Sequence, residues 1–318
     1  MSGSAATTVL LVILQMAAFV AFAPFLTATI RFTKARLQSR RGPGLLQPYR
    51  DLFKWWGKLP VESNTAGPVA RYAPAFVLGA IGTTALLVPW AAARTPLLGW
   101  GDLLVVVGLF AAARFALALA ALDTGSAFGG MGSSRDVAVS ALAEPGLVLA
   151  LAGAAIAAGS SDLGAISAFG IGRGAGLIGP AHLLAAAAFA IVVIAESGHH
   201  PVDNPDTHLE LTMIHEGMLL EYSGRSLATL VFASELKLAV LAAIFSAVFL
   251  PFGAATEIAP LPIAFGLVVG FVKMLLIGQA LAILDSSVAK VRFLQLPDLI
   301  GLASLLALAG LGIQVLLP

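Results

Sequence analysis

The sequence predicts an all-α, polytopic membrane protein with about eight transmembrane helices. Of its 318 residues, 59% are hydrophobic and only 11% are charged, whereas a soluble domain carries about 25% charged residues. The apolar residues stand in long continuous runs rich in Ala and Leu, and roughly 20 such residues in a helix span a bilayer. A membrane barrel would alternate apolar and polar residues, so we predict helices and a single membrane domain over residues 1–318.

The predicted spans follow the apolar runs in chain order. The first run, Thr7 to Ile30, lacks a basic segment before it and is too long for the apolar part of a signal peptide, so we interpret it as a span. An even number of spans places both ends of the chain on one side of the membrane. The predicted spans cover residues 7–30, 72–93, 101–122, 137–158, 180–198, 226–250, 260–284 and 294–316.

Basic residues in the connecting loops predict the orientation in a cell inner membrane. The loop after the first span carries nine basic residues and the other odd-numbered loops add four, while the even-numbered loops carry only Arg94 and Arg173. Because basic loops stay in the cytoplasm, we expect the odd-numbered loops inside and both termini outside. The long loops 31–71 and 199–225 are then cytoplasmic, and we expect the glycine-rich segment 159–179 to be a flexible outer connector.

Several ionisable side chains fall within the predicted spans, where each costs about 2.5–3.5 kcal/mol on insertion scales. Glu235 and Lys237 are two residues apart and point to different faces of a helix, so Lys273 is a candidate partner for Glu235. The functional interpretation is a proton relay, and the alternative is a set of ion pairs between helices. The in-span charges are Arg114, Glu144, Glu196, Glu235, Lys237 and Lys273, with Asp123 and Asp285 near span ends.

The loop 199–225 is acidic and holds four of the five histidines. Its part from His208 to Gly224 has apolar residues at helical spacing, so we predict a helix there. The segment has no HExxH pattern, and adjacent His199 and His200 would diverge on a helix, so we predict no metal site. The acidic residues of this loop are Asp203, Asp206, Glu210, Glu216 and Glu221.

Two long motifs carry a family resemblance over essentially the whole chain. They are ARLQSRRGPGLLQPYRDLFKWWGK, from Ala35 to Lys58, and the stretch from Glu196 through PVDNPDTHLEL to EYSG at Glu221–Gly224. Both resemble the subunit 1 family of respiratory complex I, and particularly its hydrogenase relatives of the formate hydrogenlyase subunit 4 and hydrogenase-4 component C type. Complex I subunits carry a few extra residues where this chain has only Gly44, Leu45 and Leu46, which favours the hydrogenase branch.

The resemblance implies the membrane-anchoring, proton-coupling subunit of a group 4 nickel–iron hydrogenase or formate hydrogenlyase complex, with no catalytic residue of its own. It places Glu144, Glu196, Glu210, Glu216 and Glu221 on an acidic proton path. The charges in and beside the spans add Asp203, Glu235 and Lys237 to that path. The residues that match the family's docking loop for the hydrophilic arm are Arg36, Arg40, Arg41, Gln47, Arg50 and Asp51.

The absence of cysteine limits the cofactors that this chain could hold. Iron–sulfur clusters need Cys thiolates, so we expect the clusters and the nickel–iron centre in partner subunits. The expected partners are the hydrogenase large and small subunits, antiporter-like membrane subunits and the lipid bilayer. The net charge of +1 gives no reason to expect nucleic acid. Three alternatives remain open: a quinone-binding subunit of a complex I-like NADH dehydrogenase, a stand-alone cation/proton transporter, and a passive membrane anchor.

Overall fold

The predicted all-α membrane architecture is confirmed. The computed structural model describes residues 2–93, 100–199, 202–203, 213–257, 259–289, 291 and 293–316. Within that part of the chain, eight helices are long and apolar enough to cross a membrane. They are α1 (Ser2–Leu37), α3 (Pro68–Leu87), α4 (Leu103–Asp123), α5 (Ala127–Ala158), α7 (Pro180–Ser197), α8 (Gly224–Phe249), α9 (Pro260–Ser287) and α10 (Leu296–Leu316).

Local capping and proline chemistry explain where these helices differ from the predicted spans. Helix α5 begins ten residues before its predicted span because the Ser126 side chain accepts a hydrogen bond from Gly129 N and caps an earlier, more polar turn. Helix α3 ends at Leu87 because Val88 precedes a proline and adopts an extended conformation. Asp102 caps α4 by accepting a hydrogen bond from Leu104 N at 2.7 Å.

The connecting loops contain short helices, and two loop predictions need correction. Helix α2 (Gln47–Trp56) lies in the first loop. The segment 159–179 is not a simple flexible connector, because it holds α6 (Leu163–Arg173) and the 3-10 turn η1 (Gly174–Leu177). The predicted helix 208–224 is wrong for the described residues 213–223, which form only the 3-10 turn η3 (Glu216–Leu219). A further turn, η4 (Phe293–Gln295), precedes α10.

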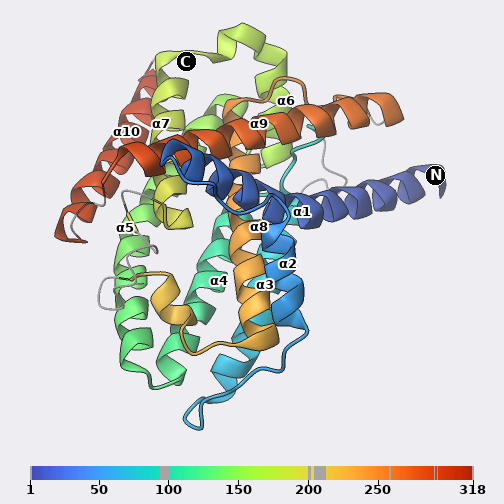
Figure 1. The fold of residues 1–318 in the computed structure, drawn as a ribbon. Helices are drawn as coiled ribbons and strands as arrows, with labels where there is room; N and C mark the ends of the chain where they lie inside the picture. Colours follow the sequence, from blue (N-terminus) through green and yellow to red (C-terminus); the bar gives the residue numbers. More distant parts are fainter. Residues whose placement is uncertain are drawn as a thin grey trace.

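Helix α8 is the central element of the bundle. It packs against α1, α3, α7 and α9, and its hydrophobic stretch is the most buried of the candidate spans in the described chain, at 72%. Helices α1 and α9 lie side by side and run across the direction of α3, α4 and α8, while α5, α7 and α10 pack together on another flank (Figure 1). Glu235 and Lys237, in the middle of α8, are therefore largely enclosed by neighbouring helices.

The two long loops meet at the end of the bundle where α8 begins. Ser223 Oγ accepts a hydrogen bond from Val61 N at 2.7 Å, and Arg225 Nε donates to Trp56 O at 3.1 Å. Tyr222 donates to Ala70 O at 2.9 Å, and burial raises the pKa of this tyrosine to about 12, so it stays a neutral donor. These contacts join the first loop to the end of the second.

Candidate functional site

A network of charged side chains crosses the interior between four spans. Arg114 on α4 is 8% exposed and pairs through Nη1 with Glu144 Oε1 on α5 and through Nη2 with the carboxylate of Glu196 on α7. Lys237 on α8 places its Nζ 2.8 Å from Glu196 Oε2. We call Arg114, Glu144, Glu196 and Lys237 the central network. Each buried charge in it has an opposite charge beside it, which offsets the cost of removing it from water.

Glu144 and Glu196 have different surroundings within this network. The Glu196 side chain is only 3% exposed, whereas that of Glu144 is 36% exposed. Glu144 stands directly before Pro145 in α5, where the proline removes one backbone donor from the helix. The network thus has a closed member at Glu196 and a more open member at Glu144.

A second pair, the buried Asp136 with the partly exposed His215, lies beside the central network. His215 Nδ1 lies 3.0 Å from Asp136 Oδ1, and in the described part of the chain Asp136 Oδ2 is buried without a hydrogen-bond partner. A cavity of about 60 Å³ is lined by Arg114, Asp136, His215 and Lys237. A space of this size with several polar walls can hold water. The pair and the network therefore face the same small cavity.

The Asp136–His215 pair was not among the residues predicted from the sequence. Asp136 precedes the apolar run 137–158, so it was assigned to a loop rather than to the helix that contains it. Its spacing carries a usable signal, because Asp136 and Glu144 are eight residues apart and share a face of α5. His215 reaches it because the backbone of the second loop approaches Gly132, where an added Cβ would lie 3.0 Å from Ile214 O.

Glu235 lines a larger cavity on the side of α8 that faces α1. The cavity has a volume of about 530 Å³, and its charged and imidazole lining comprises Arg31, Lys34, Arg40, His199, Asp203, Glu216, Glu235 and Asp285. Glu235 is 5% exposed, and its Oε2 has no hydrogen-bond partner among the described residues. Ser234 lines this cavity and also the 60 Å³ cavity, so the two spaces adjoin at α8.

The wall of the larger cavity is ordered by hydrogen bonds. His199 Nδ1 lies 2.7 Å from Asp285 Oδ2 at the end of α9. Asp203 Oδ2 accepts from Ile214 N at 3.2 Å and from His215 N at 3.4 Å. Asp203 therefore holds the backbone of His215, whose side chain contacts Asp136. This links the wall of the larger cavity to the Asp136–His215 pair.

The remaining residues predicted for the proton path lie in different places. Glu216 is exposed and lines the larger cavity. Glu221 is exposed and lies in a separate groove with Glu62 and Arg71. Glu210 falls outside the described residues. The predicted pairing of Lys273 with Glu235 is wrong, because Lys273 Nζ donates to Leu250 O, at the opposite end of α8.

The residues predicted for partner docking form an exposed basic surface on the first loop. Arg36, Arg40, Arg41 and Arg50 are exposed, and the Arg36 guanidinium lies 5.0 Å from the centre of the Phe32 ring. On α2, Gln47 Nε2 donates to Asp51 Oδ1 at 3.0 Å, and Asp51 also pairs with Lys54 at 3.4 Å. Phe53 on the same helix is 74% exposed. This surface combines permanent positive charge with aromatic side chains.

Curated relatives of this chain are membrane-complex subunits. The chain is 37% identical to hydrogenase-4 component C of Escherichia coli K12 over 272 residues, covering 85% of this chain and 84% of that protein. It is 34% identical to formate hydrogenlyase subunit 4 of the same organism over 289 residues, covering 90% and 92%. An NADH-quinone oxidoreductase subunit of Koribacter versatilis is more distant, at 28% identity over 235 residues, covering 69% and 54%.

A solved structure shows the same fold. A chain of the membrane-bound sulfane sulfur reductase, an archaeal respiratory membrane complex, superposes with a TM-score of 0.83 at 22% identity, covering 98% of this chain and 99% of that one. The profile of the family described as NADH dehydrogenase matches residues 8–316. This multi-pass membrane chain, whose relatives include hydrogenase-4 and formate hydrogenlyase subunits, therefore belongs to the NADH dehydrogenase subunit 1 family.

Proposed function

We propose that this protein is the membrane subunit of a group 4 nickel–iron hydrogenase or formate hydrogenlyase complex, where it anchors the redox arm and couples its reaction to proton movement. The similarity to hydrogenase-4 component C and formate hydrogenlyase subunit 4 supports the class of complex. The observation that carries the coupling role is the central network. Four spans each contribute one charged side chain to this network, which lies beside a cavity that can hold water.

The proposed proton route runs from the loop face into the bundle. Glu216 and Glu235 line the larger cavity. Ser234 lines both that cavity and the 60 Å³ cavity beside the central network. Carboxylates and imidazole exchange protons across a hydrogen bond or one intervening water. Arg114 lines the small cavity and contacts both Glu196 and Glu144, the more exposed member of the network.

The basic first loop is the proposed docking surface. The excess of basic residues in the odd-numbered loops supports an orientation in which these loops face the cytoplasm and both termini face outward. Exposed Arg40, Arg41 and Arg50 suit carboxylates on the large and small subunits. The nickel–iron centre and the iron–sulfur clusters would lie in those subunits, and antiporter-like subunits would pack beside this chain in the membrane.

The substitution Glu196→Gln in the intact complex tests the coupling role. It removes the carboxylate that joins Arg114 and Lys237 while keeping the side chain's size. We expect proton movement linked to the redox reaction to fall at least about a hundredfold, the lower end of what a positioned proton-transfer group contributes. Proton uptake and redox turnover would be measured in membrane vesicles.

Two readouts make that experiment decisive. The matched control is Glu62→Gln, which breaks an exposed pair with Arg71 and should leave coupling unchanged. Gel filtration with subunit analysis must show that the Glu196→Gln complex assembles. An assembled Glu196→Gln complex with normal coupling would remove the basis for this proposal.

A second candidate function is quinone binding, and the larger cavity is the observation that favours it. At about 530 Å³ it falls within the usual range of roughly 300–1,000 Å³ for small-molecule sites. A photoreactive quinone analogue that labels α1, residues 197–199 or Asp203 would support this candidate. Hydrogen evolution by the purified complex without labelling would favour the hydrogenase assignment.

A further inference from the structure

A third cavity lies at the end of the bundle opposite the long loops. Its volume is about 290 Å³, and it lies between the end of α5, the helix α6, the start of α7 and the ends of α8 and α10. Helix α8 begins beside the first loop and ends at this cavity. Along α8, Lys237 of the central network precedes Val248 of this cavity by eleven residues, so the cavity lies beyond the network, toward the end of the bundle that faces away from the long loops.

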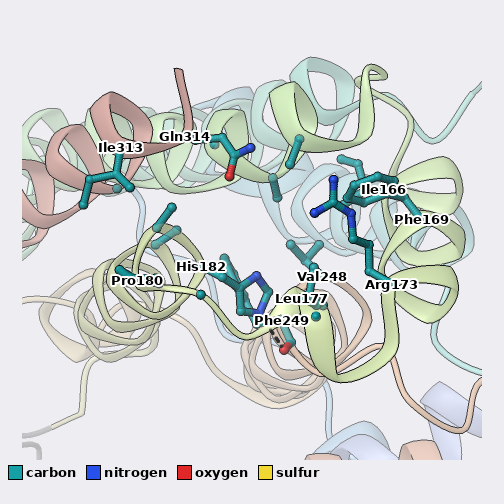
Figure 2. A pocket seen from close by; sticks show the side chains of 18 residues that line it. Ile166, Phe169, Arg173, Leu177, Pro180, His182, Val248, Phe249, Ile313 and Gln314 are labelled. Atoms are coloured by element: carbon teal, nitrogen blue, oxygen red, sulfur yellow. Dashed lines mark hydrogen bonds between the residues drawn. The ribbon is translucent and has the colours of Figure 1, made fainter. Parts of the chain in front are cut away.

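The cavity has apolar walls and three polar side chains from different elements. Phe169, Leu177, Val248 and Ile313 line the walls. Figure 2 shows Arg173 from α6, His182 from α7 and Gln314 from α10 arranged around the open space. Such a combination suits an amphipathic ligand, because the apolar part and the polar part of the ligand each find a matching surface.

The cation in this cavity is available to a ligand. Arg173 carries its guanidinium 5.2 Å from the centre of the Phe169 ring, and no carboxylate among the described residues forms an ion pair with it. His182 Nε2 lies 3.0 Å from Phe249 O, which fixes the ring at the cavity wall. No side chain caps the start of α7, so its first N–H groups add to the positive character of this wall.

Glycine keeps the space open. A Cβ added at Gly153 on α5, or at Gly176 or Gly179, would meet no other atom within 4 Å. All three positions line the cavity. A larger side chain at Gly153 would therefore extend into the empty space without first displacing a neighbour.

We propose that this cavity binds an anionic phospholipid of the adjacent leaflet, with its phosphate near Arg173 and the start of an acyl chain between α5, α7 and α10. The volume is at the lower end of small-molecule sites, so it takes the head-group region and part of a chain, while the remainder lies in the bilayer. Free phosphate would satisfy the cation but leave the apolar walls unfilled. An uncharged lipid would do the reverse.

The experiment uses the intact complex in nanodiscs of phosphatidylcholine with a minor fraction of phosphatidylglycerol. Native mass spectrometry after release counts the phosphatidylglycerol molecules that stay bound. We expect Arg173→Gln, which removes roughly one charge-assisted contact, and Gly153→Leu, which fills part of the cavity, each to weaken retention at least about tenfold. Arg173→Lys should keep most of the retention, since it preserves the charge.

The matched control is Gly108→Leu, because an added Cβ at Gly108 also meets no atom within 4 Å but faces outward on α4. It should retain as much phosphatidylglycerol as the wild type. Equal retention by wild type, Arg173→Gln and Gly153→Leu would overturn the proposal. The proposal would also be overturned if inorganic phosphate alone, or phosphatidylcholine alone, stabilised the delipidated complex as much as phosphatidylglycerol does.

Discussion

Glu196 and Glu235 are buried to the same degree, at 4% and 5% exposed, but their surroundings differ. Glu196 contacts two cations, Arg114 and Lys237, within the central network. Glu235 has an oxygen without a hydrogen-bond partner in the described chain, and it faces a cavity of about 530 Å³. Burial alone therefore does not define a role. One carboxylate is held by fixed charges, and the other borders a space where its partners can change.

The largest expected effect comes from removing the centre of the network. Arg114→Met leaves Glu196 with only Lys237 and deprives Glu144 of its ion pair. Breaking a buried pair on one side costs about 3–5 kcal/mol of unfolding free energy. Thermal unfolding of the purified complex would measure the loss. Arg71→Met breaks an exposed pair and should cost less than about 1 kcal/mol, so equal losses would refute a fixed-charge role for Arg114.

A glycine substitution tests whether the second loop is part of the same unit. In Gly132→Ala the new Cβ would lie 3.0 Å from Ile214 O and 3.2 Å from Met218 N, so the loop must shift away from α5. We expect a loss of about 1–3 kcal/mol and faster hydrogen exchange at residues 213–219, because His215 is drawn from Asp136. Gly130→Ala is the control, since its nearest neighbouring atom is 4.0 Å away. Unchanged exchange in Gly132→Ala would contradict this coupling.

Glu235→Gln and Glu196→Gln compare the two carboxylates directly. Glu235 has no ion pair within 4.0 Å among the described residues, so its amide variant should change the unfolding free energy by less than about 1 kcal/mol. Glu196→Gln should cost more, because it leaves Lys237 without its carboxylate. Both variants should lose proton coupling. If Glu235→Gln retained full coupling in vesicles, the larger cavity would not belong to the route.

A small, pH-dependent effect is expected at Asp102, an accessible carboxylate that serves as a reference for the two buried carboxylates, Glu196 and Glu235. The Ser161 hydroxyl and Leu104 N–H donate to it and lower its pKa below the usual value. Its stabilising contribution is therefore complete above that usual value and is lost as pH falls through the lowered pKa. Asp102→Ala should cost about 1 kcal/mol at neutral pH. Unfolding of both forms at decreasing pH should show this difference disappear in acid.

The spans and most of the central network follow from the sequence. Continuous apolar runs determine spanning helices, and Arg114, Glu144, Glu196 and Lys237 stand out because charges are rare in such runs. Their mutual contacts were not predictable, because spacing along one helix says nothing about which helices meet. Lys273 illustrates this, since it contacts Leu250 O rather than Glu235.

Loop structure was the least predictable part. The glycines of 159–179 suggested a flexible connector, yet Asp162 caps α6 by accepting a hydrogen bond from Ala165 N at 2.9 Å. In 213–223 the apolar spacing suggested a helix, but Asp203 binds the N–H groups of Ile214 and His215 and holds them in a turn. In each case a single carboxylate decided the local conformation.

Three hydrogen bonds join the two long loops into one connected unit. They link Ser223 to Val61, Tyr222 to Ala70, and Arg225 to Trp56. A protein that binds the arginines of the first loop would therefore also restrain the second loop, even if it does not contact that loop directly. The second loop in turn contacts Asp136 on α5 through His215. The loop surface outside the membrane is thus connected to Asp136 inside the bundle by direct protein contacts, and this connection does not depend on the transfer of an electron or an ion.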